Sequence, residues 1–147
     1  MSDLIVRRAE AKDVDRIAEL EIQCFTTPWS REAVYQDVVE NQRALYLVAE
    51  IEGLVIGYAG IWSIVDEGHI TNVAVAPEFR QHHIGSAIIA VLLEVTEKAG
   101  ITSHTLEVRR GNEPAIKLYE KYGFKVAGER KGYYEDTGED ALIMWRE

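Results

Sequence analysis

The spacing of hydrophobic and polar positions along the chain predicts seven strands and four helices. Apolar residues that recur every three to four positions mark one face of a helix, whereas apolar residues that alternate or run together over a short stretch mark a strand. The predicted strands are Leu4–Arg8, Ala44–Ile51, Leu54–Ile64, His69–Val75, Thr105–Arg109, Phe124–Arg130 and Ala141–Arg146. The predicted helices are Asp13–Cys24, Arg31–Asn41, Gly85–Ala99 and a segment that begins at about Glu113.

Residues at the expected helix ends support these limits. Ser30 is a typical N-cap for the second helix, and Pro114 suits the first turn of the fourth. Gly100 and Gly123 stand where a left-handed residue would close the third and fourth helices. The resulting order, β-α-α-β-β-β-α-β-α-β-β, predicts a mixed sheet packed by helices and places the chain in the α/β (α+β) class.

Length and composition indicate one globular domain over residues 1–147. The chain is 47% hydrophobic and 28% charged, which gives neither a disorder signature nor a membrane span. The first residues, Met1-Ser-Asp-Leu, lack the basic and apolar regions of a secretory signal. The single cysteine, Cys24, excludes an internal disulfide and suits a small hydrophobe on an apolar face. We therefore expect a cytoplasmic protein that does not bind membranes.

The formal net charge of −9 argues against direct binding of nucleic acid, which needs cations over the phosphates. It suits a basic macromolecular substrate, because charge of opposite sign steers association. An anionic cofactor would need positive charge gathered locally despite this total. The basic residues expected to form such a cofactor cleft are Arg80, His82, His83, Arg109, Arg110 and Lys117.

The segment from Ile70 to Gly85 predicts an anion site. Strand Ile70–Ala76 turns through Pro77–Ile84 into an apolar helix that opens at Gly85. The first N–H groups of a helix have no partner within it and point toward one spot, where the helix dipole adds positive potential. A diphosphate is a biological anion of the size that such a turn accepts.

Within this segment Arg80-Gln-His-His-Ile-Gly85 resembles the acyl-CoA-binding motif of the Gcn5-related N-acetyltransferases (the GNAT family), usually Gln/Arg-x-x-Gly-x-Gly/Ala. His83 takes the place of the first glycine. Leu106–Phe124 is similar to the second half of the same family's active site. Further segments resemble its branch of RimI-type alanine N-acetyltransferases: Cys24-Phe25, Pro28-Trp29-Ser30, Asp66-Glu67, Arg130-Lys-Gly-Tyr-Tyr134 and Glu139–Met144.

This resemblance implies a fold and a cofactor. In the family's single-domain fold, the central strand and the strand after the cofactor helix run parallel and splay apart within a mostly antiparallel sheet. Acetyl-CoA, as co-substrate, would lie between His69–Val75 and Thr105–Arg109, where its peptide-like arm satisfies unpaired backbone groups. The implied cofactor-binding residues are Val73, Ala74, Val75, Arg80, Gln81, His82, His83, Ile84, Gly85, Ser86 and Asn112.

Most of the implied cofactor contacts come from the main chain. Val73–Val75 would include the N–H that polarises the thioester carbonyl, and Gln81–Ser86 would face the diphosphate with N–H groups. Asn112 would contact the cofactor through its amide, and it also suits a helix N-cap. At His83 a β-carbon is tolerable if φ is negative, and a protonated imidazole could help bind the anion.

Transfer of an acetyl group from a thioester to an amine needs a neutral amine, stabilisation of the carbonyl oxygen and a proton for the departing thiolate. Glu107 alternates with Leu106 and Val108, which by itself fits a solvated carboxylate; the resemblance implies a general base. Tyr119, with an ordinary phenol pKa of about 10, by itself fits a packing residue; the resemblance implies the proton donor. Tyr122 lies off the matching position, and we expect it to be structural.

The loops that border the peptide groove in the RimI-type branch carry the candidate acceptor site. Its residues are Phe25, Pro28, Trp29, Glu67, Tyr133 and Tyr134. Aromatic residues in polar loops also pack simply as lids, and Glu67 with Asp66 could hold a positively charged peptide or cap the turn. The four histidines are too scattered in sequence for a zinc site, so we expect no metal.

The resemblance predicts a RimI-type N-α-acetyltransferase that acts on the N-terminal alanine of a small-subunit ribosomal protein, by direct transfer in a ternary complex. An α-amino group has a pKa of about 8, against about 10.4 for lysine, so the base has less to do at an N-terminus. Two alternatives stay open. One is an acetyltransferase for a small amine, polyamine or lysine side chain, and the other is a non-catalytic acyl-CoA-binding module. The oligomeric state is not predicted.

Overall fold

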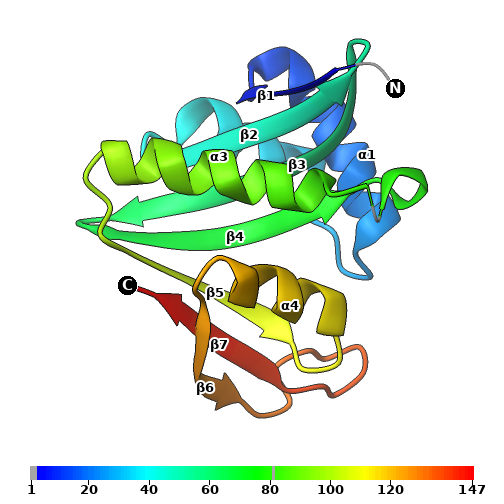
Figure 1. Ribbon diagram of the computed structural model, residues 1–147. Helices are drawn as coiled ribbons and strands as arrows, with labels where there is room; N and C mark the ends of the chain where they lie inside the picture. The colour runs from blue at the N-terminus through cyan, green and yellow to red at the C-terminus, as the bar shows by residue number, and fades with distance from the viewer. Residues whose placement is uncertain (1–2, 81) are drawn as a thin grey trace.

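Seven strands form one mixed sheet in the computed structural model, which describes residues 3–80 and 82–147. The order across the sheet is β1-β2-β3-β4-β5-β7-β6 (Figure 1). The strands are β1 Leu4–Arg8, β2 Ala44–Ile51, β3 Leu54–Ile64, β4 Glu67–Val75, β5 Ser103–Arg109, β6 Lys125–Arg130 and β7 Ala141–Arg146. Each neighbouring pair is antiparallel except β4 and β5, which run parallel. The seven predicted strands are confirmed to within two residues at each end.

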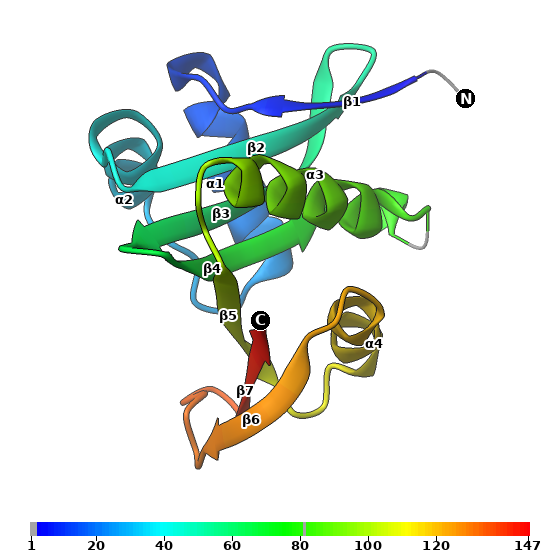
Figure 2. The same cartoon turned by 60° about the vertical axis from the view of Figure 1, so that its left-hand side comes forward.

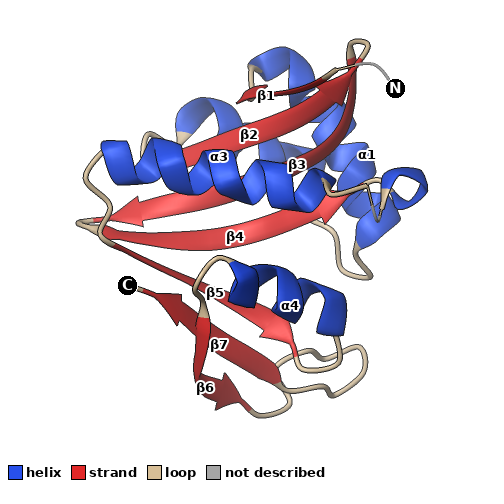
Figure 3. Cartoon of the chain, viewed as in Figure 1, coloured by secondary structure: helices blue, strands red, loops and turns tan. Residues whose placement is uncertain are grey.

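Helices cover both faces of this sheet (Figure 1 and Figure 3). They are α1 Val14–Cys24, α2 Arg31–Tyr35, α3 Ile84–Lys98 and α4 Glu113–Lys121, with short helical turns η1 Ala11–Asp13, η2 Gln36–Glu40 and η3 Pro77–Phe79. α3 and α4 pack into the core on one face, and α1 and α2 pack into the core on the other. No helix in the described part of the chain is long and apolar enough to cross a bilayer.

The alternation of residues along the central strands supplies these two cores. In β2, Leu47 and Ala49 face the core under α3, whereas Tyr46 and Val48 face the core under α1. The central strands are therefore buried on both faces, which explains why their sequences are nearly continuous hydrophobic runs.

The second predicted helix, Arg31–Asn41, is a regular α-helix only in its first half. Ser30 caps it as predicted, because its Oγ accepts the N–H of the residue three positions later at 3.1 Å. The second half is the π-helical turn η2, which carries the buried Asp37. There the carboxylate accepts hydrogen bonds from the Tyr46 hydroxyl at 2.7 Å and the Trp62 indole at 2.8 Å. These long-range partners accompany the wider turn, which the local pattern did not predict.

β4 and β5 pair over four residues and then separate. The pairing covers Glu67 to Ile70 of β4. A bulge in β4, with Thr71 as its extra residue, lies at the point of separation. Beyond it β4 stays paired with β3, whereas β5 stays paired with β7, so β5, β6, β7 and α4 turn away from the rest of the sheet (Figure 2). The predicted splayed parallel pair is confirmed.

Gly100 and Gly123 follow α3 and α4, as predicted. Both residues are in the left-handed region, with φ values of +100° and +90°. A β-carbon is strained at these values, so glycine ends each helix with the least conformational cost.

Candidate active site

The separation of β4 from β5 opens a groove of about 760 Å³. Its walls come from the α1–α2 loop, β4, β5, α4 and the β6–β7 loop. The predicted site residues that line it are Phe25, Trp29, Val73, Glu107, Asn112, Tyr119, Tyr133 and Tyr134. Two predicted acceptor residues, Pro28 and Glu67, are not among the lining residues. Pro28 is exposed, and Glu67 lies beside the lining residue His69, with Oε1 3.6 Å from Nε2.

Glu107 projects from β5 into this groove. Leu106 and Val108 on either side of it are buried, whereas the Glu107 side chain is 34% exposed, as strand alternation predicts. Its Oε2 lies 3.0 Å from the Nε of Arg130, whose guanidinium stands 5.6 Å from the centre of the Tyr133 ring. The carboxylate is thus accessible and held at the side of the groove that carries Tyr133 and Tyr134.

Tyr119 reaches the groove from α4. Only 8% of the residue is exposed, and its ring packs edge-on against Phe124 with 5.8 Å between centroids. Burial, with a smaller contribution from the neighbouring Tyr134, raises the pKa of the Tyr119 phenol. The side chain is therefore a packing residue and, at the same time, a protonated hydroxyl at the groove surface.

Tyr122, one turn later on α4, ties the two helices of this face together. Its hydroxyl lies 2.6 Å from the Ser86 Oγ and 3.0 Å from the Ser86 carbonyl oxygen, to which it donates. Lys121 Nζ also donates to the Ser86 Oγ at 3.3 Å. This geometry fits the expected structural role of Tyr122. Because the Ser86 hydroxyl is engaged, the group that Ser86 can offer an anion is its backbone N–H.

His83 precedes α3 with a φ of +62°, in the left-handed region. The condition under which a β-carbon would be tolerated there, a negative φ, is therefore not met. The usual glycine of the motif suits this φ, whereas histidine carries backbone strain. The Ala87 N–H donates to the His83 carbonyl at 3.1 Å, so helix geometry leaves the N–H groups of Ile84, Gly85 and Ser86 for an outside acceptor.

The rest of the predicted anion turn packs closely against its surroundings. A β-carbon on Gly85 would lie 3.3 Å from Leu118 Cδ2, so the glycine permits close contact between α3 and α4. Ile84 is buried in the core, and exposed Arg80 donates from Nε to the Val75 carbonyl at 3.3 Å. Gln81, predicted to face the diphosphate, lies outside the described residues.

Of two more predicted cofactor residues, Ala74 is buried and Asn112 lines the groove. Ala74 is buried in the core under α1. Asn112 lines the groove and is the N-cap of α4, because its Oδ1 accepts the Ala115 N–H at 3.3 Å. The N-cap prediction is confirmed. His82, between Gln81 and His83, is exposed on the turn.

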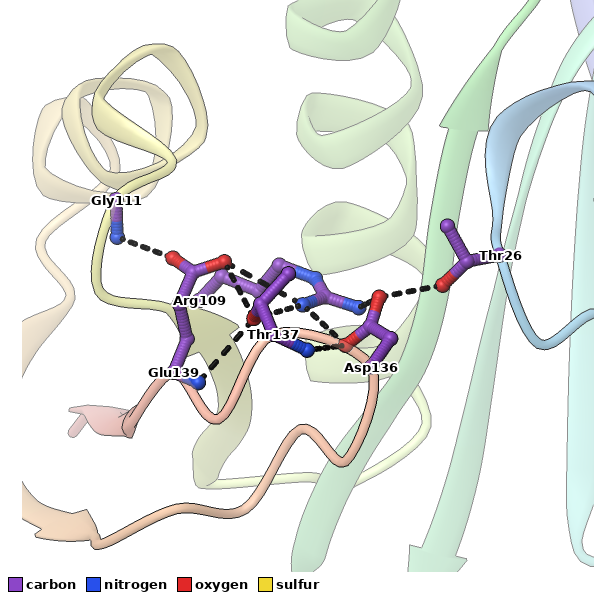
Figure 4. A network of polar contacts seen from close by, with 6 residues as sticks. All are labelled: Thr26, Arg109, Gly111, Asp136, Thr137 and Glu139. Atoms are coloured by element: carbon purple, nitrogen blue, oxygen red, sulfur yellow. Dashed lines mark hydrogen bonds and ion pairs between the residues drawn. The ribbon is translucent and has the colours of Figure 1, made fainter.

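Arg109 holds the β6–β7 loop through a network of polar contacts (Figure 4). Its two terminal nitrogens each donate to an Asp136 oxygen at 2.9 Å, and Nη1 also lies 3.4 Å from Glu139 Oε1. Its guanidinium stacks 4.0 Å from the centre of the Tyr134 ring. The Thr26 Oγ1 of the α1–α2 loop donates to Asp136 Oδ2 at 2.6 Å, across the groove. Arg109 and then Thr26 lower the pKa of Asp136 to about 2.

The placement of Arg109 and Arg110 corrects the predicted charge distribution. Arg110 contacts Glu129 and lies 3.8 Å from Asp140, so both arginines are paired with carboxylates of the C-terminal strands and loop. Both residues were predicted to neutralise an anionic cofactor, and both instead secure the loop that carries Tyr133 and Tyr134. The sequence could not reveal this because their acidic partners lie about 20–30 residues later.

Glu21 is a groove residue that the sequence interpretation missed. It lies on α1, is only 1% exposed and lines the groove from below the α1–α2 loop. Its Oε1 accepts the Trp29 N–H at 2.7 Å, and its Oε2 accepts the Asn72 amide at 2.7 Å and the Tyr58 hydroxyl. Burial raises the pKa of Glu21, although these donors act in the opposite direction. The available signal was a carboxylate directly after Leu20, on the apolar stripe of its helix.

Cys24 packs against the core under α1, as expected for a small hydrophobe, and its Sγ lies 3.4 Å from the Val75 carbonyl oxygen. The Val75 carbonyl is thus engaged by both Cys24 and Arg80, which leaves its N–H as the group it can offer. Among residues 3–80 and 82–147, no three side chains of the histidine, cysteine, aspartate or glutamate type gather as metal ligands would.

The sequence that forms this fold and groove matches a known family of proteins. Residues 14–124, which carry α1 through to the end of α4, match the model of the Acetyltransferase (GNAT) family. The chain belongs to the GNAT family. Members of this family transfer acetyl groups from acetyl-CoA.

Relatives of this GNAT protein match over nearly the full length of both chains. A Bacillus subtilis protein, provisionally named a [ribosomal protein bS18]-alanine N-acetyltransferase, is 42% identical over 95% of this chain and 93% of its own. The Escherichia coli K12 protein named [ribosomal protein bS18]-alanine N-acetyltransferase is 33% identical over 92% and 91%. The crystal structure of the E. coli ribosomal-protein-S18-alanine N-acetyltransferase superposes with a TM-score of 0.91 at 30% identity, over 98% of this chain and 93% of that one.

The residues of this GNAT chain fit an acetyl-CoA molecule that runs from the free edge of β4 to the start of α3, which lies outside the lining of the groove. The β4 edge beyond Ile70 has left its parallel neighbour, so its backbone groups there are available to a peptide-like arm. The N–H groups at the start of α3 suit a diphosphate, and Arg80 and His82 stand exposed on the same turn.

Proposed function

We propose that this protein is an N-α-acetyltransferase that transfers the acetyl group of acetyl-CoA to the N-terminal alanine of ribosomal protein bS18, directly and in a ternary complex. The observation that carries the proposal is the placement of Glu107 and Tyr119 in one groove, at the point where β4 and β5 separate. The names of the two bacterial relatives support the acceptor. A ribosomal substrate would make the protein cytoplasmic.

Acetyl-CoA would supply an acetyl thioester, held by the start of α3 and the free edge of β4. The N–H groups of Ile84, Gly85 and Ser86 would bind the diphosphate, with Arg80 adding positive charge and His82 a ring N–H donor. Close packing at Gly85 lets α3 approach α4, which carries Tyr119. The backbone of Val73 would face the thioester carbonyl, because Val73 lines the groove just beyond the β4 bulge.

Glu107 would act as the general base and Tyr119 as the general acid. The Glu107 carboxylate takes a proton from the acceptor ammonium group, directly or through one water, since its side chain remains partly exposed. The Tyr119 hydroxyl gives its proton to the departing thiolate. Burial raises the pKa of the phenol, so the hydroxyl carries its proton at neutral pH and is available to give it.

The acceptor peptide would enter between the α1–α2 loop and the β6–β7 loop. Phe25 and Trp29 line the groove from the first loop, and Tyr133 and Tyr134 from the second. The two tyrosine rings meet edge to face, with 5.1 Å between centroids. Such rings offer large, rigid apolar surfaces with polar edges, which suits contact with a short peptide.

The decisive experiment measures release of free coenzyme A thiol when purified protein is mixed with acetyl-CoA and different acceptors. A peptide with the bS18 N-terminal sequence should release thiol, and the same peptide with its α-amino group blocked should not. Faster release with a lysine-containing blocked peptide, or with a polyamine, would replace the proposed acceptor. Binding of acetyl-CoA without thiol release for any amine would mean a non-catalytic module.

Glu107→Gln should lower turnover of the alanine peptide by about 10²–10⁴-fold, because the amide keeps the shape of the side chain and loses its basicity. Acetyl-CoA affinity, measured by calorimetry, should stay at the wild-type value. Part of the lost rate should return at about pH 9, where the α-amine is already neutral. Glu94→Gln, on the exposed side of α3, is the matched control and should change nothing. Equal impairment at every pH would show that Glu107 positions the peptide instead.

A further inference from the structure

Glu21 joins four elements of the fold at one carboxylate. The side chain comes from α1, and its three hydrogen-bond donors come from the α1–α2 loop (Trp29), β3 (Tyr58) and β4 (Asn72). Burial of a charged group is unfavourable unless several donors surround it, and an apolar side chain of similar size often serves a core equally well. The carboxylate is therefore better explained by what it positions than by stability.

Two of the three donors of Glu21, Trp29 and Asn72, belong to the two sides of the proposed reaction. Trp29 is in the loop that forms one wall of the acceptor groove, and its ring lies 6.4 Å from that of Trp62. Asn72 directly follows the bulge residue Thr71 and directly precedes Val73 in the part of β4 that has left β5. One carboxylate thus links the acceptor wall to the strand that would face the thioester.

We propose that Glu21 is a positioning residue that fixes the acceptor loop relative to the bulge of β4, and so sets the approach of the acceptor amine to the thioester carbonyl. The inference rests on the proposed function. It differs from a structural role in one respect: loss of the link should impair the use of the peptide far more than the binding of acetyl-CoA, because the start of α3, which would hold the diphosphate, is not attached to Glu21.

Glu21→Gln tests the link with little change of shape. The amide oxygen can still accept the Trp29 N–H, but the new NH₂ group faces the NH₂ group of Asn72, so the link to β4 is lost unless Asn72 turns its amide oxygen toward it. We expect kcat/KM for the alanine peptide to fall by about 10²-fold, the scale of a misplacement of about 1 Å. The Kd for acetyl-CoA should stay within about twofold of the wild-type value.

A second substitution supplies a rescue. In Glu21→Gln/Asn72→Asp the carboxylate moves to β4 and accepts from the new amide on α1, so a donor–acceptor pair spans the same gap. The double variant should recover most of the lost kcat/KM. Should Glu21→Gln alone fail to fold, Asn72→Ala removes only the β4 end of the link and should also lower kcat/KM with acetyl-CoA binding retained.

Asp13 provides the matched control at the other end of the same helix. It is also buried and accepts three hydrogen bonds, from the Arg7 guanidinium at 2.8 and 2.9 Å and from the Glu10 N–H at 2.8 Å, but it does not line the groove. Asp13→Asn should lower the melting temperature and leave kcat/KM unchanged below it. A Glu21→Gln variant that behaves like Asp13→Asn overturns the proposal, as does a double variant no better than the single one. Inactivity of the wild type on the peptide would instead count against the proposed function.

Discussion

The two walls of the groove are fixed by opposite kinds of interaction. The α1–α2 loop is held from below by Glu21, a buried carboxylate whose donors are all neutral. The β6–β7 loop is held by Arg109 through ion pairs with Asp136 and Glu139 that remain partly exposed. Salt screens exposed charges far more than buried ones. The first wall should therefore keep its position under most conditions, whereas the second can be loosened.

The proposed chemistry lies on the side of the ionic wall. Glu107 is two residues before Arg109 in β5, and Tyr119 follows on α4, so both belong to the part of the fold that turns away after Ile70. The Thr26–Asp136 hydrogen bond reaches across from the buried-carboxylate wall. Glu107 and Arg109 thus stand on the same strand, β5, whereas the α1–α2 loop is attached to the other half of the sheet through Glu21.

The largest effect in this comparison should follow from Tyr119→Phe. Removal of the hydroxyl should lower turnover by about 10²-fold or more, the usual scale for a lost general acid, while acetyl-CoA still binds. Because burial raises the pKa of Tyr119, the wild-type rate should show no decline from phenol ionisation near pH 10. Rates from pH 6 to 10 measure both effects. Tyr122→Phe, one turn later and bonded to Ser86, is the control; equal losses in the two variants would remove Tyr119 from the chemistry.

A smaller effect should follow from Arg109→Met, which keeps the length of the side chain and removes its ion pairs. We expect kcat/KM for the peptide to fall roughly tenfold, because exposed ion pairs are individually weak but three contacts are lost together. Wild-type kcat/KM should itself fall as salt rises, and the variant should have lost that dependence. Lys98→Met, which breaks an exposed pair on α3, should do neither. If kcat/KM of the variant depends on salt as strongly as that of wild type, the ion pairs of Arg109 are not the source of the salt dependence.

Arg109 also shows which parts of this molecule the sequence could predict. Strand limits, the N-caps Ser30 and Asn112, and the glycines that close α3 and α4 follow from neighbouring residues, so the pattern predicted them. The partners of Glu21 lie 8, 37 and 51 residues away, and those of Arg109 lie 27 to 30 residues away. No local pattern contains such pairs. The resemblance to GNAT proteins placed Glu107 and Tyr119 in one groove, but it could not place the groups that hold the walls.

The segment where β5 still pairs with β4 joins the two halves of the sheet, and its contribution to stability should decrease in acid. His104 is fully buried there, its Nε2 lies 2.8 Å from the Thr96 Oγ1, and burial lowers its pKa. The unfolded chain takes up a proton below about pH 6.5 and the folded chain does not, so the free energy of unfolding should decrease as pH falls, by at most about 1.4 kcal/mol per unit. Urea unfolding at pH 7.5, 6.0 and 5.0 measures this slope.

His104→Gln should flatten that pH dependence, because the amide does not titrate. If His104→Gln has the same slope as wild type, the acid sensitivity comes from groups other than His104, and the segment where β4 pairs with β5 is not its source.

The smallest effect concerns the start of α3, outside the lining of the groove, where backbone N–H groups would hold the diphosphate. His83→Gly should raise the free energy of unfolding by about 0.5–1 kcal/mol, because a left-handed φ strains histidine while the greater freedom of glycine in the unfolded chain offsets part of the gain. His82→Gly is the adjacent control: His82 is not among the described residues with positive φ, so the same substitution should lower stability.

The same variant separates backbone from side chain in anion binding. If the N–H groups at the start of α3 supply most of the site, acetyl-CoA affinity of His83→Gly should stay level or improve, equally at pH 6 and pH 8. If the His83 imidazolium contacts the diphosphate, affinity should fall, and fall more at pH 6, where histidine is charged. We expect the first result, because those N–H groups remain fixed by the helix whichever residue precedes it. Calorimetry at the two pH values shows whether the His83 side chain binds the diphosphate or only occupies the position of the usual glycine.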